Sequence, residues 1–244
     1  MNFLFQAFYT FLFAPFLNGL VLLYSIVGDL GLAIVFLTLI VKVALFPLSL
    51  KALRSQKQMQ KINPQIAEIK QKHKGNLTEQ NVALLELYKK EEISPTSGCL
   101  PLLIQLPIVI ALYRVFTSGL TIENIDKFLY SFVPNPGAIP QQVFWVFSAN
   151  SKAFILTLAI LAALAQFWQS KISFKGAPKQ KSGSNLDFGS MMQKQALFIF
   201  PLITFFIIYK TGIVVGVYWF FSVLFSLGEH FIMERNFKKI KQKI

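Results

Sequence analysis

The segment Leu30–Leu50, LGLAIVFLTLIVKVALFPLSL, decides how the rest of the chain is arranged. All but four of its residues are apolar or glycine. The exceptions are Thr38, Lys42, Pro47 and Ser49. A helix of about 20 apolar residues crosses the hydrocarbon core of a bilayer, so this segment is the first predicted membrane span. At a helical rise of 1.5 Å per residue, Lys42 lies about 18 Å from its outer end and about 12 Å from its inner end.

Because a lysine at that depth is costly, Lys42 needs a polar neighbourhood. Thr38 and Ser49 stand four residues before it and seven residues after it, on the same side of a helix. A lysine can also extend to the lipid headgroups, but from position 42 that route is long. We therefore expect Lys42 to face a cavity inside a bundle of helices.

The composition is that of a polytopic membrane protein. Hydrophobic residues make up 54% of the chain, and phenylalanine alone occurs 26 times. A net charge of +13 would suit a nucleic-acid-binding protein. The basic residues, however, gather between the apolar segments, where they set the topology and meet anionic lipid. The single cysteine, Cys99, cannot form an internal disulfide.

Residues 1–29 contain no lysine or arginine, so they lack the basic start of a secretory signal. The run is apolar and aromatic, and we read Phe3 to Ile26 as a helix at the outer interface of the membrane. It leads into the first span at Gly28-Asp29. A further membrane span is the alternative, and it would place the N-terminus on the opposite side.

Residues 51–97 are polar and charged, and they predict a cytoplasmic helical hairpin. Apolar residues of the first arm recur at helical spacing, namely Met59, Ile62, Ile66 and Ile69. Gly75-Asn76 interrupts this helix, and Asn76 or Thr78 can cap a second helix that ends at Lys90. The second arm has its own apolar stripe, formed by Val82, Leu85 and Tyr88. A solvated loop is the alternative, but it would not explain the periodicity.

Four further apolar segments predict four more spans. They are residues 98–116, 153–170, 195–209 and 213–233. An outer loop (117–152), a cytoplasmic loop (171–194) and a basic tail (234–244) connect or follow them. Lysine and arginine concentrate in the hairpin, the cytoplasmic loop and the tail. The positive-inside rule then places the N-terminus outside and the C-terminus in the cytoplasm.

Several polar residues within these spans are candidates to line the cavity beside Lys42. We rank Gln105 first, then Gln166 and Trp219, then Ser222. Trp219, Ser222, Ser226 and His230 share one face of the last predicted helix. Polar residues inside a membrane also join helices to one another by hydrogen bonds, which is the competing interpretation.

Five short motifs resemble the YidC/Oxa/Alb family of membrane protein insertases. They are Lys42 with Pro47, Asn63-Pro64, Ser94-Pro95, the run from Gly98 to Pro107 (GCLPLLIQLP), and Gly212, Gly216 and Tyr218-Trp219. The resemblance covers about residues 20 to 233, and residues 94 to 113 are its most specific part. It is to the compact five-span bacterial form, without the large periplasmic domain of Gram-negative relatives.

The resemblance implies an all-α polytopic membrane protein of the bacterial inner membrane. Five transmembrane helices would surround a hydrophilic groove that is open to the cytoplasm and to lipid. The groove carries one positive charge, at the position of Lys42, where bacterial members usually have arginine. From their helical spacing, we expect Thr38, Gln105, Gln166, Trp219 and Ser222 to line the groove as well. The implied activity inserts and helps to fold nascent membrane proteins without ATP.

The resemblance also assigns roles to the segments outside the membrane. The hairpin would recruit substrates through Met59, Ile62, Ile66, Leu85 and Tyr88. The tail, through Lys238, Lys239, Lys241 and Lys243, would contact either the ribosome or anionic lipid. Implied partners are nascent membrane proteins, the ribosome and the Sec translocon, with no nucleic-acid recognition apart from contact with ribosomal RNA.

Two other functional classes compete with an insertase. A small-anion transporter or channel could use Lys42 as its anion site, but transporters commonly carry internal repeats and we find none here. An intramembrane hydrolase would need a Ser/His/Asp, HExxH or paired-Asp arrangement, and Glu229-His230 provides none of these. The sequence carries no motif for a metal, nucleotide or cofactor. We therefore expect a protein that is not an enzyme and uses no cofactor.

Overall fold

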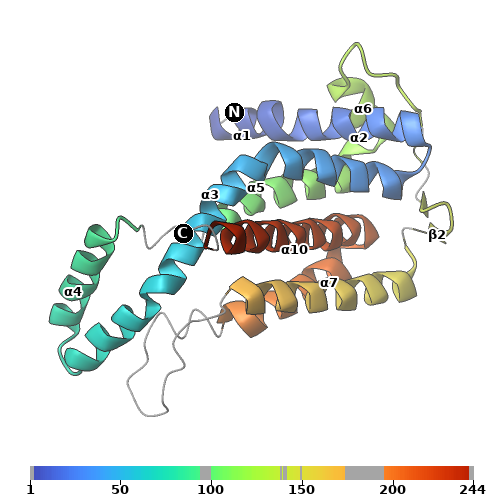
Figure 1. Cartoon of the computed structure of the whole chain (residues 1–244). Helices are drawn as coiled ribbons and strands as arrows, with labels where there is room; N and C mark the ends of the chain where they lie inside the picture. The colour runs from blue at the N-terminus through green and yellow to red at the C-terminus, as the bar shows by residue number, and fades with distance from the viewer. Residues whose placement is uncertain are drawn as a thin grey trace.

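The structure is a computed structural model of the whole chain, and it describes residues 3–93, 100–137, 139, 142–148, 150–173 and 195–241. The described part is almost entirely helical, as expected of an all-α membrane protein (Figure 1). Four of its helices are long and apolar enough to cross a membrane: Gln6–Val27, Leu30–Lys72, Lys152–Ser173 and Ile213–Arg235. Two shorter apolar helices lie at Gln105–Thr117 and Leu197–Thr211. The predicted class of an all-α polytopic membrane protein is therefore confirmed.

The N-terminal segment forms one apolar helical run. It consists of α1 (Phe3–Phe8), a π-helical turn η1 (Tyr9–Phe13) and α2 (Ala14–Val27). The run ends at Gly28, whose φ of 71° lies in the left-handed region that glycine adopts most readily. Its length and composition suit a membrane span as well as a helix at the interface.

The first predicted span and the first arm of the hairpin are a single helix, α3 (Leu30–Lys72). The expected boundary at residues 50 and 51 is a change of composition, and the helix does not break there. Pro47 and Pro64 both lie inside α3 without ending it. At 1.5 Å per residue α3 is about 65 Å long, so its second half extends well beyond the bundle (Figure 1).

The second arm of the hairpin is α4 (Leu77–Lys90), and Asn76 caps it by accepting a hydrogen bond from the Glu79 N–H at 3.2 Å. A small cluster joins the two arms, formed by Ile62, Ile66, Leu87 and Ile93 with Met59, Ile69, Leu84 and Tyr88 around them. The predicted stripe of α4 was wrong in part. Val82 and Leu85 are exposed (Leu85 at 56%), because Leu84 and Leu87 form the face that meets α3.

The remaining helices follow the predicted apolar segments. They are α5 (Leu100–Arg114) with its π-helical extension η3 (Val115–Gly119), α7 (Lys152–Ser173), η4 (Gln195–Ile199) with α9 (Phe200–Thr211), and α10 (Ile213–Lys241). Helix α10 continues through much of the segment that was expected to be a separate tail. The predicted outer loop contains α6 (Ile122–Phe128) and a small antiparallel pair, β1 (Gln142–Val143) with β2 (Phe147–Ser148), which we did not predict.

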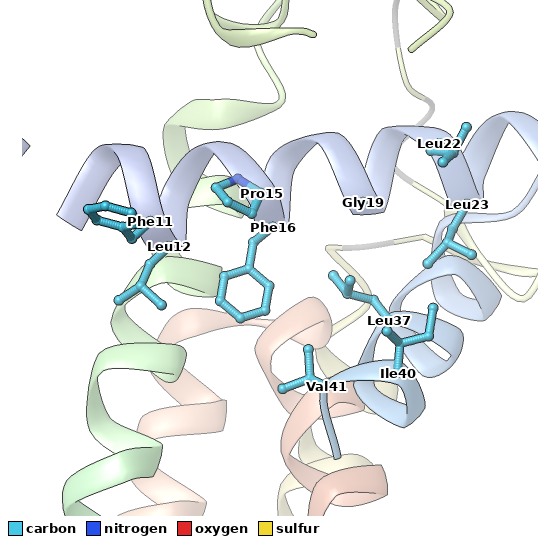
Figure 2. Close-up of a pocket in the computed structure, with 10 residues that line it drawn as sticks. All are labelled: Phe11, Leu12, Pro15, Phe16, Gly19, Leu22, Leu23, Leu37, Ile40 and Val41. Carbon is cyan, nitrogen blue, oxygen red and sulfur yellow. The ribbon is translucent and has the colours of Figure 1, made fainter. Parts of the chain in front are cut away.

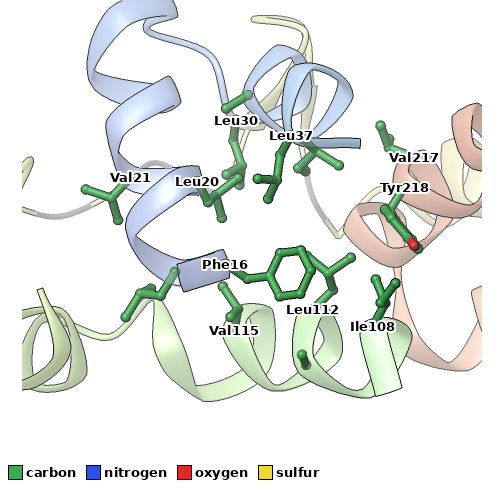
Figure 3. Packing of buried hydrophobic residues seen from close by; sticks show 14 of the residues in the cluster. Phe16, Leu20, Val21, Leu30, Leu37, Ile108, Leu112, Val115, Val217 and Tyr218 are labelled. Atoms are coloured by element: carbon green, nitrogen blue, oxygen red, sulfur yellow. The ribbon is translucent and has the colours of Figure 1, made fainter. Parts of the chain in front are cut away.

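The bundle has two unlike ends. We call the end that carries the α2–α3 turn, α6 and the β1–β2 pair the loop end, and the end from which α3 and α4 project the hairpin end (Figure 1). The main core lies at the loop end, where α2, α3, α5 and α10 meet (Figure 3). On α3 its buried members fall between Leu30 and Leu37, and on α10 between Ile213 and Tyr218. Beyond these segments, the same two helices carry the polar residues of the candidate site.

Two buried polar side chains attach the loop of residues 117–152 to the loop end. Asn18 of α2 donates to the carbonyl oxygen of Phe128 at 2.9 Å and accepts from the N–H of Tyr130 at 2.6 Å. Asp29 caps α3 by accepting from the Leu32 N–H at 2.8 Å, and its other oxygen accepts from the Trp145 N–H at 2.8 Å. Each side chain thus provides hydrogen-bond partners for backbone groups of two different segments.

Candidate functional site

Lys42 points toward α10. Its Nζ donates to the Oγ of Ser226 at 3.1 Å, and the Ser226 hydroxyl donates to the backbone carbonyl of Ser222 at 3.1 Å. Lys42 is half-buried between α3 and α10. Its ammonium therefore takes part in a polar contact between two helices of the bundle, as expected of a lysine that faces the bundle interior.

An acidic residue that we did not assign to the site lies beside this contact. Glu229 is three residues after Ser226 on α10, so both side chains lie on the same face of the helix. Glu229 is only 4% exposed, and it is close enough to Lys42 for their charges to interact. The Ser49 side chain, two turns after Lys42 on α3, is a hydrogen-bond partner of the Glu229 carboxylate. Our sequence analysis weighed Glu229 only as part of a hydrolase, although its spacing from Ser222 and Ser226 placed it on the polar face.

Two more of the predicted residues also meet α10. The Gln105 Nε2 of α5 donates to the hydroxyl of Tyr218 at 2.7 Å, and Tyr218 is 2% exposed. The indole N–H of Trp219 points at the Oε1 of Gln166 on α7, at a long 3.5 Å. Polar side chains of α3, α5 and α7 thus all pair with α10, which makes α10 the common wall of the candidate site.

Thr38 behaves differently from the other predicted residues. It is 1% exposed, and its hydroxyl donates to the Ile34 carbonyl of its own helix at 2.7 Å. Its donor is therefore already used within α3. Ser222 is also buried, its carbonyl oxygen accepts from the Ser226 hydroxyl, and its side chain is a hydrogen-bond partner of the Tyr218 hydroxyl.

The residues predicted for the hairpin and the tail lie far from Lys42 along the chain. Met59, Ile62, Ile66 and Tyr88 belong to the small cluster that holds the hairpin together, whereas Leu85 points outward. Lys238, Lys239 and Lys241 fall in the last turns of α10, where the structure describes no side chains. Lys243 lies outside the described residues.

A second polar contact, near the hairpin end, was also missed. The Gln60 Nε2 of α3 donates to the carbonyl oxygen of Ser173 at 2.6 Å, and the Ser173 hydroxyl lies 3.3 Å from the Nε2 of His230. These contacts connect the last turn of α7 to α3 and α10. They hold α3 in place where it leaves the bundle.

One hollow in the described part of the molecule is apolar and does not include Lys42. It measures about 350 Å³ and opens between α2 and α3 (Figure 2). Its walls include Phe11, Phe16 and Leu23 of the N-terminal helical run, and Leu37 and Ile40 of α3. With no polar side chain in its lining, this hollow offers nothing that would bind a polar segment.

Comparison with known proteins assigns the chain to a family. A sequence model of the 60Kd inner membrane protein family matches residues 22–242. The chain belongs to this family. Family membership confirms the resemblance to the YidC/Oxa/Alb insertases, and together with the long apolar helices it indicates a multi-pass protein of the bacterial inner membrane.

Two relatives in the 60Kd inner membrane protein family carry the name membrane protein insertase YidC. The one from Wolinella succinogenes is 31% identical over 237 residues, which is 96% of this chain and 39% of that protein. The one from Francisella tularensis subsp. novicida is 30% identical over 223 residues, which is 91% of this chain and 35% of that protein. The chain therefore spans less than half the length of these relatives.

Proposed function

We propose that this chain is a membrane protein insertase and chaperone that inserts and helps to fold nascent membrane proteins. The observation that carries the proposal is the polar contact of Lys42 with Ser226 on α10, in a chain similar to proteins named insertases. A half-buried ammonium between two helices offers an attractive site for an acidic side chain that enters from water. In this proposal Lys42, Gln105, Gln166, Trp219 and Ser222 line a hydrophilic groove open to the cytoplasm and to lipid.

Such a groove needs no ATP to move a short polar tail across the membrane. It shortens the distance over which the tail loses its hydration, and Lys42 attracts acidic residues of the tail. The apolar helix that follows then enters lipid, where each leucine-like residue contributes on the order of −0.5 kcal/mol. About twenty such residues outweigh one or two charges at roughly +3 kcal/mol each. The protein therefore lowers a barrier, and no catalytic group or cofactor is required.

The segments outside the bundle have supporting roles in this proposal. The hairpin makes the first contact with a client, and the exposed apolar side chains of α4, Leu77, Val82 and Leu85, suit that contact. The basic tail binds the ribosome or anionic lipid, and the Sec translocon is a further partner. We also propose that the N-terminus is outside and the C-terminus is in the cytoplasm. Reaction of cysteines introduced at each terminus with an impermeant reagent in intact cells tests that orientation.

The deciding experiment is complementation in a host depleted of its own insertase. Wild type, Lys42→Ala and Lys42→Glu are expressed, and a protease reports whether the N-terminal tail of a single-span client has crossed. We expect wild type to restore translocation of the client's tail. For an acidic tail, Lys42→Glu should reduce translocation by about tenfold or more. The reason is that reversing a nearby unit charge changes the interaction by on the order of 1 to 4 kcal/mol.

The other outcomes of this experiment separate the alternatives. Rescue by all three proteins would support the insertase function and show that Lys42 has no part in its mechanism. Failure of all three, with each protein stably present in the membrane, would contradict the insertase and favour a small-anion transporter or channel. Anion flux into proteoliposomes, with and without Lys42→Ala, would then be measured.

A further inference from the structure

Glu229 is the least expected group near Lys42, because a carboxylate is expensive to bury in a membrane protein. It is 4% exposed, and its Oε1 is buried without a hydrogen-bond partner among the described residues. Buried acids normally have their oxygens occupied by donors. A nearly buried carboxylate with one open oxygen therefore points to a group that exchanges partners during function.

Two groups of α3, Lys42 and Ser49, interact with Glu229. Lys42 and Ser49 lie on one side of α3, while Ser226 and Glu229 lie on the facing side of α10. Lys42 and Glu229 interact through their charges, yet the described side chains include no direct ion pair between them. Lys42 donates to Ser226 instead. The acid and the base thus share one polar region without forming a closed salt bridge.

A purely structural role explains this arrangement less well. An ion pair that serves only to hold α3 against α10 would be expected to close, because a direct contact offsets the cost of burying both charges. Here Lys42 and Glu229 lie near each other without direct contact. Lys42 can still donate to another group, and Glu229 can still accept from one. An incoming carboxylate would meet a site whose net charge is close to zero.

We propose that Glu229 is the internal counter-ion of Lys42 and competes with acidic residues of a client for it. This inference rests on the proposed insertase function and extends it. Glu229 weakens the hold of Lys42 on an acidic tail, so that the tail can leave the groove, and it reduces the repulsion of neutral or basic tails. Glu229 is in this sense a specificity-determining residue that acts through Lys42.

The first test measures the electrostatic potential that Glu229 creates at position 42, without any client. In a Cys99→Ser background, Lys42→Cys is the only thiol, and its reaction rates with a cationic and an anionic methanethiosulfonate reagent are compared in isolated membranes. A negative Glu229 favours the cationic reagent. We expect Glu229→Gln to lower the ratio of cationic to anionic rates by about three- to tenfold. Glu234→Gln, on the same helix and five residues further along, is the matched control and should leave the ratio unchanged.

An unchanged ratio in the Glu229→Gln protein would overturn the inference and leave the insertase proposal intact. Absence of reaction with both reagents would show that position 42 is closed to water, and it would overturn the inference together with the groove. These readouts do not depend on insertion activity, so failure of one proposal is distinguished from failure of the other.

The second test uses two clients whose tails differ only by an aspartate or an asparagine. Glu229→Gln should raise the ratio of acidic-tail to neutral-tail translocation by about threefold or more, because Lys42 is then unopposed. In a Lys42→Gln background the same substitution should have no effect on that ratio. An equal change with both clients, or a change that persists without Lys42, would overturn the inference and assign Glu229 a structural role.

Discussion

The loop end of the bundle and the region around Lys42 share α3 and α10 but use polar residues in opposite ways. At the loop end, buried Asn18 and Asp29 each have two or more hydrogen bonds to backbone groups, within an apolar core. Around Lys42, polar side chains meet one another in single contacts, and a Glu229 oxygen has no partner among the described residues. A buried polar side chain that makes all its hydrogen bonds is held in one position. A buried polar side chain with an unused donor or acceptor can still bind a partner that arrives from outside.

Removing a loop-end contact should have the largest effect on stability. Asp29→Ala leaves the N–H groups of Leu32 and Trp145 without their acceptor, and we expect it to lower the free energy of unfolding by about 2 to 4 kcal/mol. Unfolding in mixed detergent micelles measures this change. The matched control is Asn76→Ala, which removes an exposed helix cap with one bond and should cost about 1 kcal/mol or less. Equal losses would contradict the contrast between buried and exposed caps.

Close packing of α10 against its neighbours should give the next largest effect. A Cβ at Gly216 would lie 2.7 Å from Leu158 Cδ2 and 2.8 Å from Ile208 Cγ2. Gly216→Ala should therefore lower the free energy of unfolding by about 1 to 3 kcal/mol. Gly228→Ala makes the same change on the same helix, where a Cβ would meet nothing within 4 Å. We expect it to be neutral or slightly stabilising in the same unfolding assay. If Gly228→Ala lowered the free energy of unfolding as much as Gly216→Ala, the two glycines would not differ in how closely their neighbours pack.

The polar contact between α5 and α10 should contribute less. Gln105→Leu removes the Gln105 donor from the buried Tyr218 hydroxyl, and we expect it to lower the free energy of unfolding by about 0.5 to 1.5 kcal/mol, the range of hydrogen bonds between membrane helices. Tyr218→Phe removes the same bond from the other side. A double-mutant cycle with both substitutions measures the coupling free energy directly. A coupling near zero would mean that the two side chains do not interact.

Lys42→Arg should have the smallest effect of these changes. It keeps the positive charge that faces α10, and we expect insertion of acidic-tail clients to stay within about twofold of wild type. The complementation assay described for Lys42→Ala measures it. A severe loss with arginine would show that the compact ammonium and its bond to Ser226 matter, and that charge alone does not account for the role of Lys42.

Much of the fold could be predicted because its signals are local. Gly28-Asp29 and Gly75-Asn76 mark chain reversals through backbone preferences of the residues themselves, and the apolar runs mark the helices. The facing side of α4 was harder to predict, because Leu84 and Leu87 form as good a stripe as Val82 and Leu85. Only contact with α3 distinguishes the two stripes. The continuity of α3 past residue 50 was missed because a change from apolar to polar residues need not interrupt a helix.

The sequence by itself determined that the chain crosses the membrane several times, that a polar hairpin interrupts the spans, and that Lys42 must find a polar partner. These conclusions follow from the cost of placing backbone and charged groups in hydrocarbon, which depends only on the order of residues. Tertiary structure alone decided that the partner of Lys42 is Ser226, that Glu229 shares the region, and that Asn18 and Asp29 hold the loop of residues 117–152. Those contacts join residues more than a hundred positions apart, and helix packing selects them among many polar residues of similar character.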